Sequence, residues 1–270
     1  MVEPALMPFC RLVELHTGIH LDASKQYLME SRLAPLAQQQ GQTVPGLLHI
    51  LIRTPVGPLH HRAFEALATH ETRFFRDPAF FKALADHLIP ALIAQARAHK
   101  ALRICCAGVS TGQEAYSVAI LLHERFPELR DWNVLIQATD LSAVALDKAR
   151  AGLYCAVEVQ RGLDARLLHK YFDPVGAQRY QLLPHIRSRV RFVQANLLVP
   201  PPPYPKFDLV LLRNVLIYFV QETKTRVLNH VLRHLQCPGG VLALGATESL
   251  GGYGALKPVQ FGQLCCYTHA

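Results

Sequence analysis

The sequence predicts an α/β protein with a doubly wound, mostly parallel sheet, a small N-terminal helical domain and an inserted β-hairpin subdomain. From Leu102 onwards, apolar runs of strand length alternate with segments of helical periodicity. These runs are apolar almost without interruption, which is typical of strands buried on both faces of a parallel sheet. Successive runs also end in glycine or polar residues, at the edge where such sheets bind ligands.

The composition favours a protein that acts in a reducing compartment. At 270 residues, half of them hydrophobic, the chain is long enough for one large α/β domain and a small appendage. No apolar run approaches the ~18 residues of a membrane-spanning helix, and no signal peptide precedes the first helical pattern. The seven cysteines lack C-x-x-C spacing, which indicates free thiols. We expect a cytoplasmic monomer without membrane insertion.

The charge is strongly basic. Twenty-eight lysines and arginines against 20 acids give a formal net charge of +8. Such a surface favours an acidic partner, which could be a nucleic acid, an anionic membrane or an acidic protein. Charge alone does not choose among these.

Residues 1–76 are expected to form the helical domain and a linker, and residues 77–270 the α/β domain. Gly18 closes a first helix, Asp22 or Ser24 caps a second, and Thr43 opens a third. Asp77 and Pro78 start the first helix of the larger domain. The expected apolar positions of the second helix are Tyr27, Leu28, Leu33 and Leu36, and those of the fourth are Phe64 and Leu67.

The stretch Leu102–Tyr116 predicts a buried strand, a tight turn over Gly108–Gly112, and a helix. Glycines in such a turn allow a ligand to approach the backbone. Three residues separate the two glycines, so the G-x-G-x-x-G pattern of nicotinamide-dependent enzymes is incomplete and a pyrophosphate would be poorly held. The turn therefore favours a nucleoside without phosphates, namely S-adenosylmethionine (SAM).

Four further strands are predicted, and three of them end in polar residues. An acid at the tip of the second strand is placed to hold ribose hydroxyls. The tail from Val259 to Tyr267 is expected to add an antiparallel edge. The strands and their ends are Val134–Asp140, Val190–Ala195 before Asn196, Phe207–Leu212 before Arg213 and Asn214, and Val241–Gly245.

The insertion at about 153–191 interrupts this alternation. Asp173–Gly176 is a turn signal, and Tyr180–Leu183 follows it as an apolar run. Ile186, Val190 and Phe192 interleave with arginines, so the hairpin is expected to carry one basic face formed by Arg187, Arg189 and Arg191.

Six segments carry motifs that occur together in one family. They are Thr69–Arg76, Ala107–Ser117, Ala138–Leu141, Asn196–Leu197, Leu212–Phe219, and Gly239–Gly245 with Glu248. With these motifs the chain resembles, over nearly its whole length, the chemotaxis receptor methyltransferases, the CheR family of protein-glutamate O-methyltransferases. The resemblance implies the class I SAM methyltransferase fold. The most specific motif is the Arg-Asn-x-x-Ile-Tyr-Phe run from Arg213.

The resemblance also implies roles for individual residues. Asp140 would take the ribose hydroxyls of SAM, and Asn196 and Leu197 would flank adenine. Glu114 and Arg76 suit the ammonium and carboxylate groups of the methionine end. Tyr218 would be the catalytic residue and face the substrate. The complete implied cofactor set is His70, Thr72, Arg76, Glu114, Asp140, Asn196, Leu197, Arg213 and Asn214; His70 stands where the family usually has Asn.

The implied reaction is transfer of the SAM methyl group to glutamates in the cytoplasmic helical region of a chemoreceptor. A glutamate with a pKa of ~4.3 is already ionised at neutral pH and needs no general base. The basic surface suits an acidic receptor bundle, which the N-terminal helices would meet, and no nucleic-acid partner is expected. The alternatives are a methyltransferase acting on RNA or a small molecule, and a SAM-binding signalling protein without catalysis.

Two other patterns are set aside. His230 and His234 have the i, i+4 spacing of zinc ligands, but they flank a buried apolar stripe and no Glu follows His230, so no metal is expected. Pro200–Pro205 contains Pro-Pro-Tyr, as in amino-methylating nucleic-acid enzymes, but it precedes the fourth strand where theirs follows it. We interpret it as a surface connection.

Overall fold

The computed structural model describes residues 4–200, 206–234, 239–250 and 252–270. The chain divides into two compact units, each with its own apolar core. The smaller unit comprises Met1–Thr69 and Tyr218–Arg226, and the larger comprises His70–Ile217 and Val227–Ala270. Most of the Pro200–Pro205 connection lies outside the described residues. Across the described ranges, no helix has the length and apolar character needed to cross a membrane.

The smaller unit is helical, as predicted, and two of its sequence signals act as expected. Gly18 ends the first helix with a φ of 79°, and the Thr43 hydroxyl accepts a hydrogen bond from the Gly46 N–H at 3.2 Å. Its elements are α1 (Leu6–Thr17), η1 (Ala23–Lys25), α2 (Gln26–Gln39), α3 (Val44–Arg53), α4 (Pro58–Leu67) and the first half of α12 (Gln221–Leu232).

The start of the second helix was predicted wrongly. Asp22 accepts from the Ser24 N–H at 2.8 Å, but this bond stabilises the short η1 turn, and α2 begins only at Gln26 without a side-chain cap. Tyr27 and Leu28, which the pattern placed on an apolar face, are 82% and 41% exposed. The buried stripe of α2 consists of Met29, Leu33, Leu36 and Ala37, and Tyr27 and Leu28 lie outside it.

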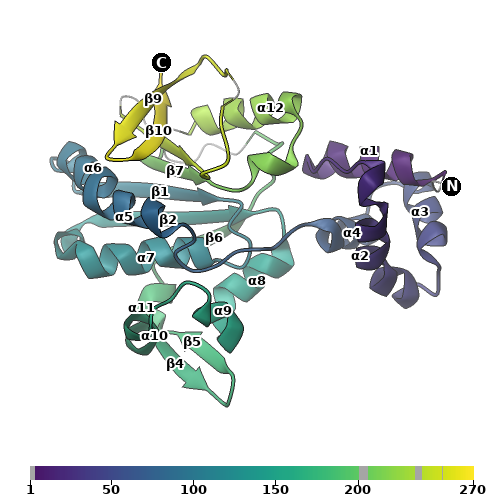
Figure 1. The fold of residues 1–270 in the computed structure, drawn as a ribbon, viewed down its shortest axis with the longest axis horizontal. Coiled ribbons are helices and arrows are strands. Elements are labelled where there is room, and N and C mark those ends of the chain that lie inside the picture. Colours follow the sequence, from purple (N-terminus) through teal and green to yellow (C-terminus); the bar gives the residue numbers. More distant parts are fainter. Residues whose placement is uncertain (1–3, 201–205, 235–238, 251) are drawn as a thin grey trace. The chain divides into compact units, whose positions relative to one another are not determined.

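The larger unit is built on a seven-stranded sheet with the order β6-β2-β1-β7-β8-β10-β9 (Figure 1). The first five strands run parallel, and β10 and β9 form the predicted antiparallel edge. The strands are β1 (Ala101–Ala107), β2 (Asn133–Asp140), β6 (Val190–Gln194), β7 (Leu209–Leu212), β8 (Val241–Leu244), β9 (Leu256–Phe261) and β10 (Leu264–His269).

Helices cover both faces of this sheet. α7 and α8 lie on one face and α12 on the other (Figure 1). β7 and β8 are buried at every position, as their uninterrupted apolar runs predicted. Ser142 caps α8 by accepting from the Ala145 N–H at 2.8 Å. The helical elements are α5 (Pro78–Ala83), the π-helical turn η2 (Leu84–Leu88), α6 (Ile89–Ala96), α7 (Gln113–Arg125), η3 (Pro127–Asp131), α8 (Ala143–Ala151) and η4 (Leu216–Tyr218).

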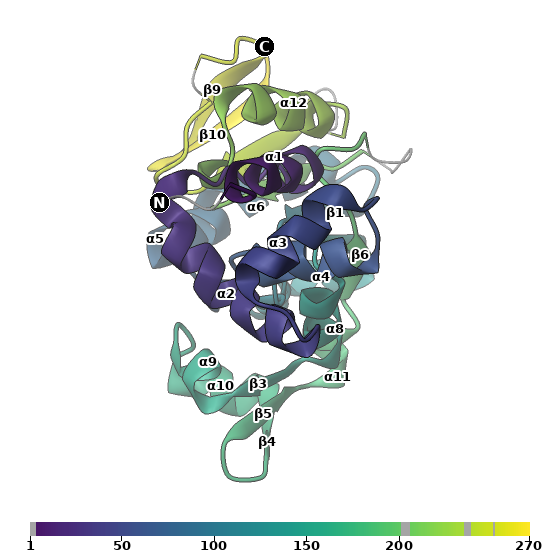
Figure 2. The ribbon, with the colours of Figure 1, turned by 90° about the vertical axis from the view of Figure 1, so that its right-hand side faces the viewer.

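The insertion forms a second, three-stranded sheet with the order β3-β5-β4 (Figure 2). The predicted hairpin is confirmed and consists of β4 and β5. The prediction that the hairpin continues through Arg187, Arg189 and Arg191 is wrong. Residues 184–187 form α11, and Val190–Gln194 pairs with β2 in the large sheet. The subdomain elements are β3 (Leu153–Cys155), α9 (Ala156–Gln160), α10 (Ala165–Tyr171), β4 (Phe172–Val175), β5 (Arg179–Leu182) and α11 (Pro184–Arg187).

Candidate functional site

The candidate site lies at the carboxyl edge of the large sheet. β6, β2, β1 and β7 are parallel neighbours, so the residues that follow them meet at one edge. Asp140 ends β2, Asn196 follows β6, and Arg213 and Asn214 follow β7. Glu114 stands in the first turn of α7, directly after the glycine turn. The structure thus brings four predicted strand ends together.

The glycine turn is shaped by contacts within the chain. Gly108 and Gly112 have φ angles of 72° and 93°, which favour glycine. A Cβ on Gly108 would lie 2.5 Å from a methyl carbon of Val215, and one on Gly112 would lie 2.8 Å from Cβ of Ala149. The glycines are therefore required for close contact with neighbouring loops and helices, and their role is not limited to admitting a ligand.

Asp140 joins the second strand to the glycine turn. Its Oδ2 accepts from the Ser110 N–H at 2.7 Å, and its Oδ1 accepts from the Ser142 N–H at 2.9 Å. Ser110 has a φ of 51°, and its hydroxyl donates to the His70 carbonyl at 3.0 Å. The Asp140 carboxylate therefore lies at the tip of β2, directly beside the glycine turn.

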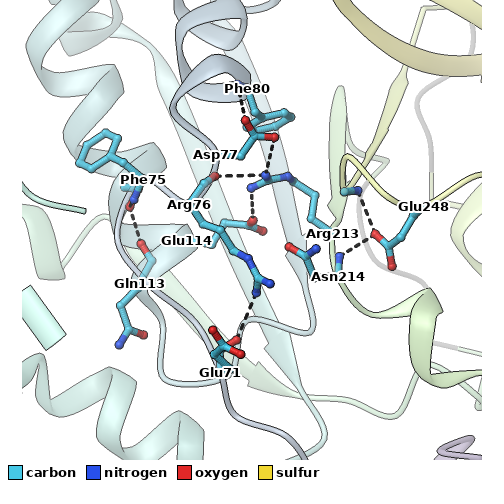
Figure 3. A network of polar contacts seen from close by, with 12 residues as sticks. Glu71, Phe75, Arg76, Asp77, Phe80, Gln113, Glu114, Arg213, Asn214 and Glu248 are labelled. Atoms are coloured by element: carbon cyan, nitrogen blue, oxygen red, sulfur yellow. Dashed lines mark hydrogen bonds and ion pairs between the residues drawn. The ribbon is translucent and has the colours of Figure 1, made fainter. Parts of the chain in front are cut away.

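Arg213 is the centre of a buried polar network (Figure 3). Its side chain is 1% exposed, and its Nη1 donates to Glu114 Oε2 at 2.8 Å. Its Nη2 donates to the Arg76 carbonyl at 3.1 Å and lies 3.6 Å from Asp77 Oδ2. The guanidinium carbon lies 3.8 Å from the Phe80 ring centroid. Arg213 therefore ties α7, the 70–77 segment and the end of β7 together.

Glu114 is a half-buried carboxylate, with a side chain 12% exposed, whose charge its surroundings compensate only partly. Burial raises its pKa, while the charge and hydrogen bond of Arg213, and then the charge of Arg76, act in the opposite direction. Glu248 adds a small further increase because it carries the same charge. A cationic group placed beside Glu114 would complete the compensation, which is what an ammonium group does.

The segment from His70 to Asp77 belongs to the larger unit and contacts the glycine turn, α7 and Arg213. The Phe75 N–H donates to the Ser117 hydroxyl at 2.9 Å, which fastens the segment to α7. Asp77 caps α5 by accepting from the Phe80 N–H at 3.2 Å, as its sequence position predicted. Arg76 is half-buried, and its Nη1 donates to the Glu71 carbonyl at 3.3 Å. Thr72, also half-buried, lies in the same segment.

Asn196 and Leu197 border a narrow, mainly apolar cavity of about 60 Å³. The Asn196 side chain accepts from the Leu198 N–H at 2.9 Å, and Nδ1 of His230 lies 3.0 Å from the Leu197 carbonyl oxygen. Cys105 also lines the cavity, where burial raises the pKa of its thiol to about 12. Among the described residues, no group of three or more His, Cys, Asp or Glu side chains is arranged to hold a metal ion.

The sequence was compared with protein families and with curated relatives. Residues 70–261 match the family described as "CheR methyltransferase, SAM binding domain". The chain belongs to the CheR methyltransferase family. It is 42% identical over 242 residues to chemotaxis protein methyltransferase 1 of Pseudomonas aeruginosa. The aligned region covers 88% of this chain and 87% of that relative. It is also 39% identical over 248 residues to chemotaxis protein methyltransferase 1 of Vibrio cholerae. That alignment covers 90% of this chain and 88% of that relative.

These findings confirm the family, the methyltransferase fold and SAM as the cofactor that the sequence predicted. The assignment of individual CheR site residues stays a prediction. Tyr218, the predicted catalytic residue, lies at the end of η4 and is half-buried, and its carbonyl accepts from the His20 N–H at 2.9 Å. Both residues belong to the smaller unit.

Two features of the site went unassigned in the sequence analysis. Glu248 matched a CheR motif but received no role, and in the structure its carboxylate contacts the backbone of the loop after β7 (Figure 3). Tyr154, from the inserted subdomain, donates its hydroxyl to the Thr111 carbonyl in the glycine turn at 2.8 Å. An acid three residues after Gly245 was the visible signal for Glu248, whereas nothing in the sequence pointed to Tyr154.

Proposed function

We propose that this chain methylates glutamate side chains in the cytoplasmic helical region of a chemoreceptor, as a monomer, with Tyr218 on the substrate side. Membership of the CheR family makes it a SAM-dependent protein-glutamate O-methyltransferase. The observation that carries the residue assignments is the juxtaposition of Glu114, Asp140 and Asn214 at one sheet edge. The proposed acidic partner is consistent with the net charge of +8.

The residues present fit SAM in chemical type. Glu114 is a half-buried carboxylate whose charge is incompletely compensated, as an ammonium partner requires. Asp140 places a carboxylate at the tip of β2, where oxygen acceptors suit ribose hydroxyls, and Asn196 and Leu197 offer an amide and an apolar surface suited to adenine. When bound, SAM would supply the methyl group of its sulfonium: a glutamate carboxylate oxygen would bond to the methyl carbon as the carbon–sulfur bond breaks, which gives a methyl ester and S-adenosylhomocysteine.

The chain's own contribution is alignment and exclusion of water, because an ionised glutamate needs no base. Arg213 holds the Glu114 carboxylate in place through its Nη1 bond, so Glu114 is fixed before the cofactor arrives. We assign Tyr218 to orient the substrate carboxylate through its phenol hydroxyl. A hydrogen bond from a phenol orients the nucleophile with less loss of nucleophilicity than a full ion pair would cause.

The test is transfer of tritiated methyl groups from SAM to candidate receptor fragments. We expect label on receptor glutamates that is released by mild base, as a methyl ester requires. Base-stable label, or label on RNA in a parallel incubation, would contradict the proposal and favour the RNA alternative.

Tyr218→Phe tests the substrate-side assignment. We expect turnover to fall by about 10-fold or more, because positioned acid–base and hydrogen-bonding groups contribute on the order of 10²-fold or more to catalysis. Affinity for S-adenosylhomocysteine, measured by calorimetry, should stay within about twofold of the wild type. Equal losses in turnover and affinity would remove Tyr218 from the substrate side.

A further inference from the structure

Glu248 binds three backbone N–H groups with one carboxylate. Its Oε2 accepts from the Asn214 N–H at 2.6 Å and from the Gly245 N–H at 2.9 Å, and its Oε1 faces the Ile217 N–H at 3.3 Å. Its own N–H donates to the Gly245 carbonyl at 2.9 Å, so Glu248 closes a tight turn after β8. One side chain thus links the ends of β7 and β8 (Figure 3).

The loop it holds is conformationally unusual. Asn214 has a φ of 59°, in the left-handed region that residues other than glycine seldom occupy. Such a conformation persists only where its surroundings fix it. The two amides held by Glu248 bracket the segment from Asn214 to Ile217, which also contains Val215, the side chain packed against Gly108.

Gly245 shows how closely the two loops approach. A Cβ on Gly245 would lie 2.7 Å from Glu248 Oε2 and 2.9 Å from Nδ2 of Asn214. The amide group of Asn214 therefore lies directly against the Gly245 backbone, where no larger residue would fit. Loss of the Glu248 carboxylate would remove the acceptor of the Asn214 N–H.

We infer that Glu248 is a positioning residue for the cofactor site and holds Asn214 in the conformation that contacts SAM. The inference rests on the proposed function, in which Asn214 belongs to the cofactor set. The proposed positioning acts through the hydrogen bonds that Glu248 accepts from Asn214 and Ile217, the residue immediately before Tyr218. Hydrogen bonds to a charged acceptor are stronger than those to a neutral one, so the negative charge of Glu248 helps to hold the loop in place.

The decisive variant is Glu248→Gln. Glutamine has the same length, but one oxygen is replaced by an NH₂ group that cannot accept from a backbone N–H. We expect the dissociation constant of S-adenosylhomocysteine to rise at least tenfold by calorimetry. We also expect faster amide hydrogen exchange at Asn214 and Ile217, measured without ligand, and unchanged exchange in β1.

Asp208→Asn is the matched control. Asp208 is also a half-buried carboxylate that accepts a backbone N–H, that of Arg103 at 2.7 Å, but it lies before β7 at the opposite edge of the sheet. We expect it to lower thermal stability about as much as Glu248→Gln while leaving the dissociation constant within twofold of the wild type. A merely structural role for Glu248 would make the two variants behave alike.

The outcomes separate this inference from the proposed function. Wild-type levels of ligand affinity or of Asn214 amide protection in Glu248→Gln would overturn the positioning role, whatever the receptor assay shows. Wild-type protein that binds S-adenosylhomocysteine but transfers no label to receptors would overturn the proposed substrate and leave the positioning role supported if the affinity loss occurs. Wild-type protein that binds no S-adenosylhomocysteine would overturn both.

Discussion

The two glutamates of α7 lie at opposite ends of one helix and have opposite electrostatic surroundings. Glu114 is in the first turn, where burial raises its pKa and Arg213 only partly offsets the increase. Glu124 is ten residues later, in the last turn, where its side chain is 14% exposed. The first lies at the candidate cofactor site and the second beneath the inserted subdomain.

The single negative charge of Glu124 is compensated by two cationic side chains and a hydroxyl group. Arg166 donates to it at 2.8 Å and Lys170 at 2.5 Å, and the Tyr171 hydroxyl donates as well. Burial acts to raise the pKa of Glu124, but these hydrogen bonds outweigh it and hold the pKa at about 2. A carboxylate saturated by its own chain is a structural anchor, whereas one left short of positive charge can bind a cation.

The largest effect is expected when the incompletely compensated carboxylate is neutralised. Glu114→Gln keeps an oxygen for Arg213 but loses the charge that would meet the ammonium group. We expect affinity for S-adenosylhomocysteine to fall by about 1.5–3 kcal/mol, the range for a hydrogen bond to a charged group. Calorimetry measures the affinity of each variant. Glu124→Gln is the control, and its affinity should equal that of the wild type. Similar losses of affinity in both variants would show that Glu114 and Glu124 do not differ in their role in cofactor binding.

The pH dependence of cofactor binding is a second test of the difference between Glu114 and Glu124. Glu114 must be ionised to attract an ammonium group, and its pKa in the free protein is raised. Affinity for S-adenosylhomocysteine should therefore fall as the pH drops through that raised pKa, because protonation then competes with binding. Glu114→Gln should lack this dependence, and a variant that retained it would assign the titration to another group.

Glu124→Gln should act on stability and leave binding alone. Because the folded-state pKa of Glu124 lies below its value of 4.5 in the unfolded chain, its contribution is complete above pH 4.5 and is lost as the pH falls towards 2. We expect the variant to be less stable by about 1–2 kcal/mol at neutral pH, since solvent screens its exposed partners. Denaturant unfolding at pH 7 and pH 3 should show this difference shrinking with acid.

The contrast between these glutamates also marks what the sequence could and could not predict. The strand ends were predictable because uninterrupted apolar runs define buried parallel strands, and their ends then share one edge. Asp140 and Asn214 followed from that rule and the family motifs. The partners of Glu114 did not, because Arg213 lies 99 residues away and only the folded chain brings them together.

The errors have similar causes. The run from Val190 was predicted both as a strand of the large sheet and, through its alternating arginines, as part of the inserted hairpin; its pairing with β2 confirms the first prediction and contradicts the second. Tyr27 and Leu28 were assigned to the apolar face of the second helix, but the face that α2 buries carries Met29, Leu33, Leu36 and Ala37 and leaves both exposed. Pairing and helix register depend on contacts distant in sequence, which local periodicity does not contain.

The smallest expected effect concerns the other attachment of the inserted subdomain, at the start of α7. Tyr154 of β3 donates to the Thr111 carbonyl in the glycine turn, and its ring packs edge-on against Phe74 with centroids 5.1 Å apart. Tyr154→Phe removes only the hydroxyl, so we expect affinity for S-adenosylhomocysteine to fall by about 0.5–1.5 kcal/mol, the range for a neutral hydrogen bond.

Tyr116→Phe is the natural control for this variant. Tyr116 is equally buried and donates to a carbonyl at 2.7 Å, but its acceptor is Ala149 in α8. Both variants should lose similar stability, and only Tyr154→Phe should weaken ligand binding, because only its acceptor lies in the turn that presents the cofactor site. Unchanged affinity in Tyr154→Phe would show that the subdomain is anchored to α7 without influencing the turn, as it is at Glu124.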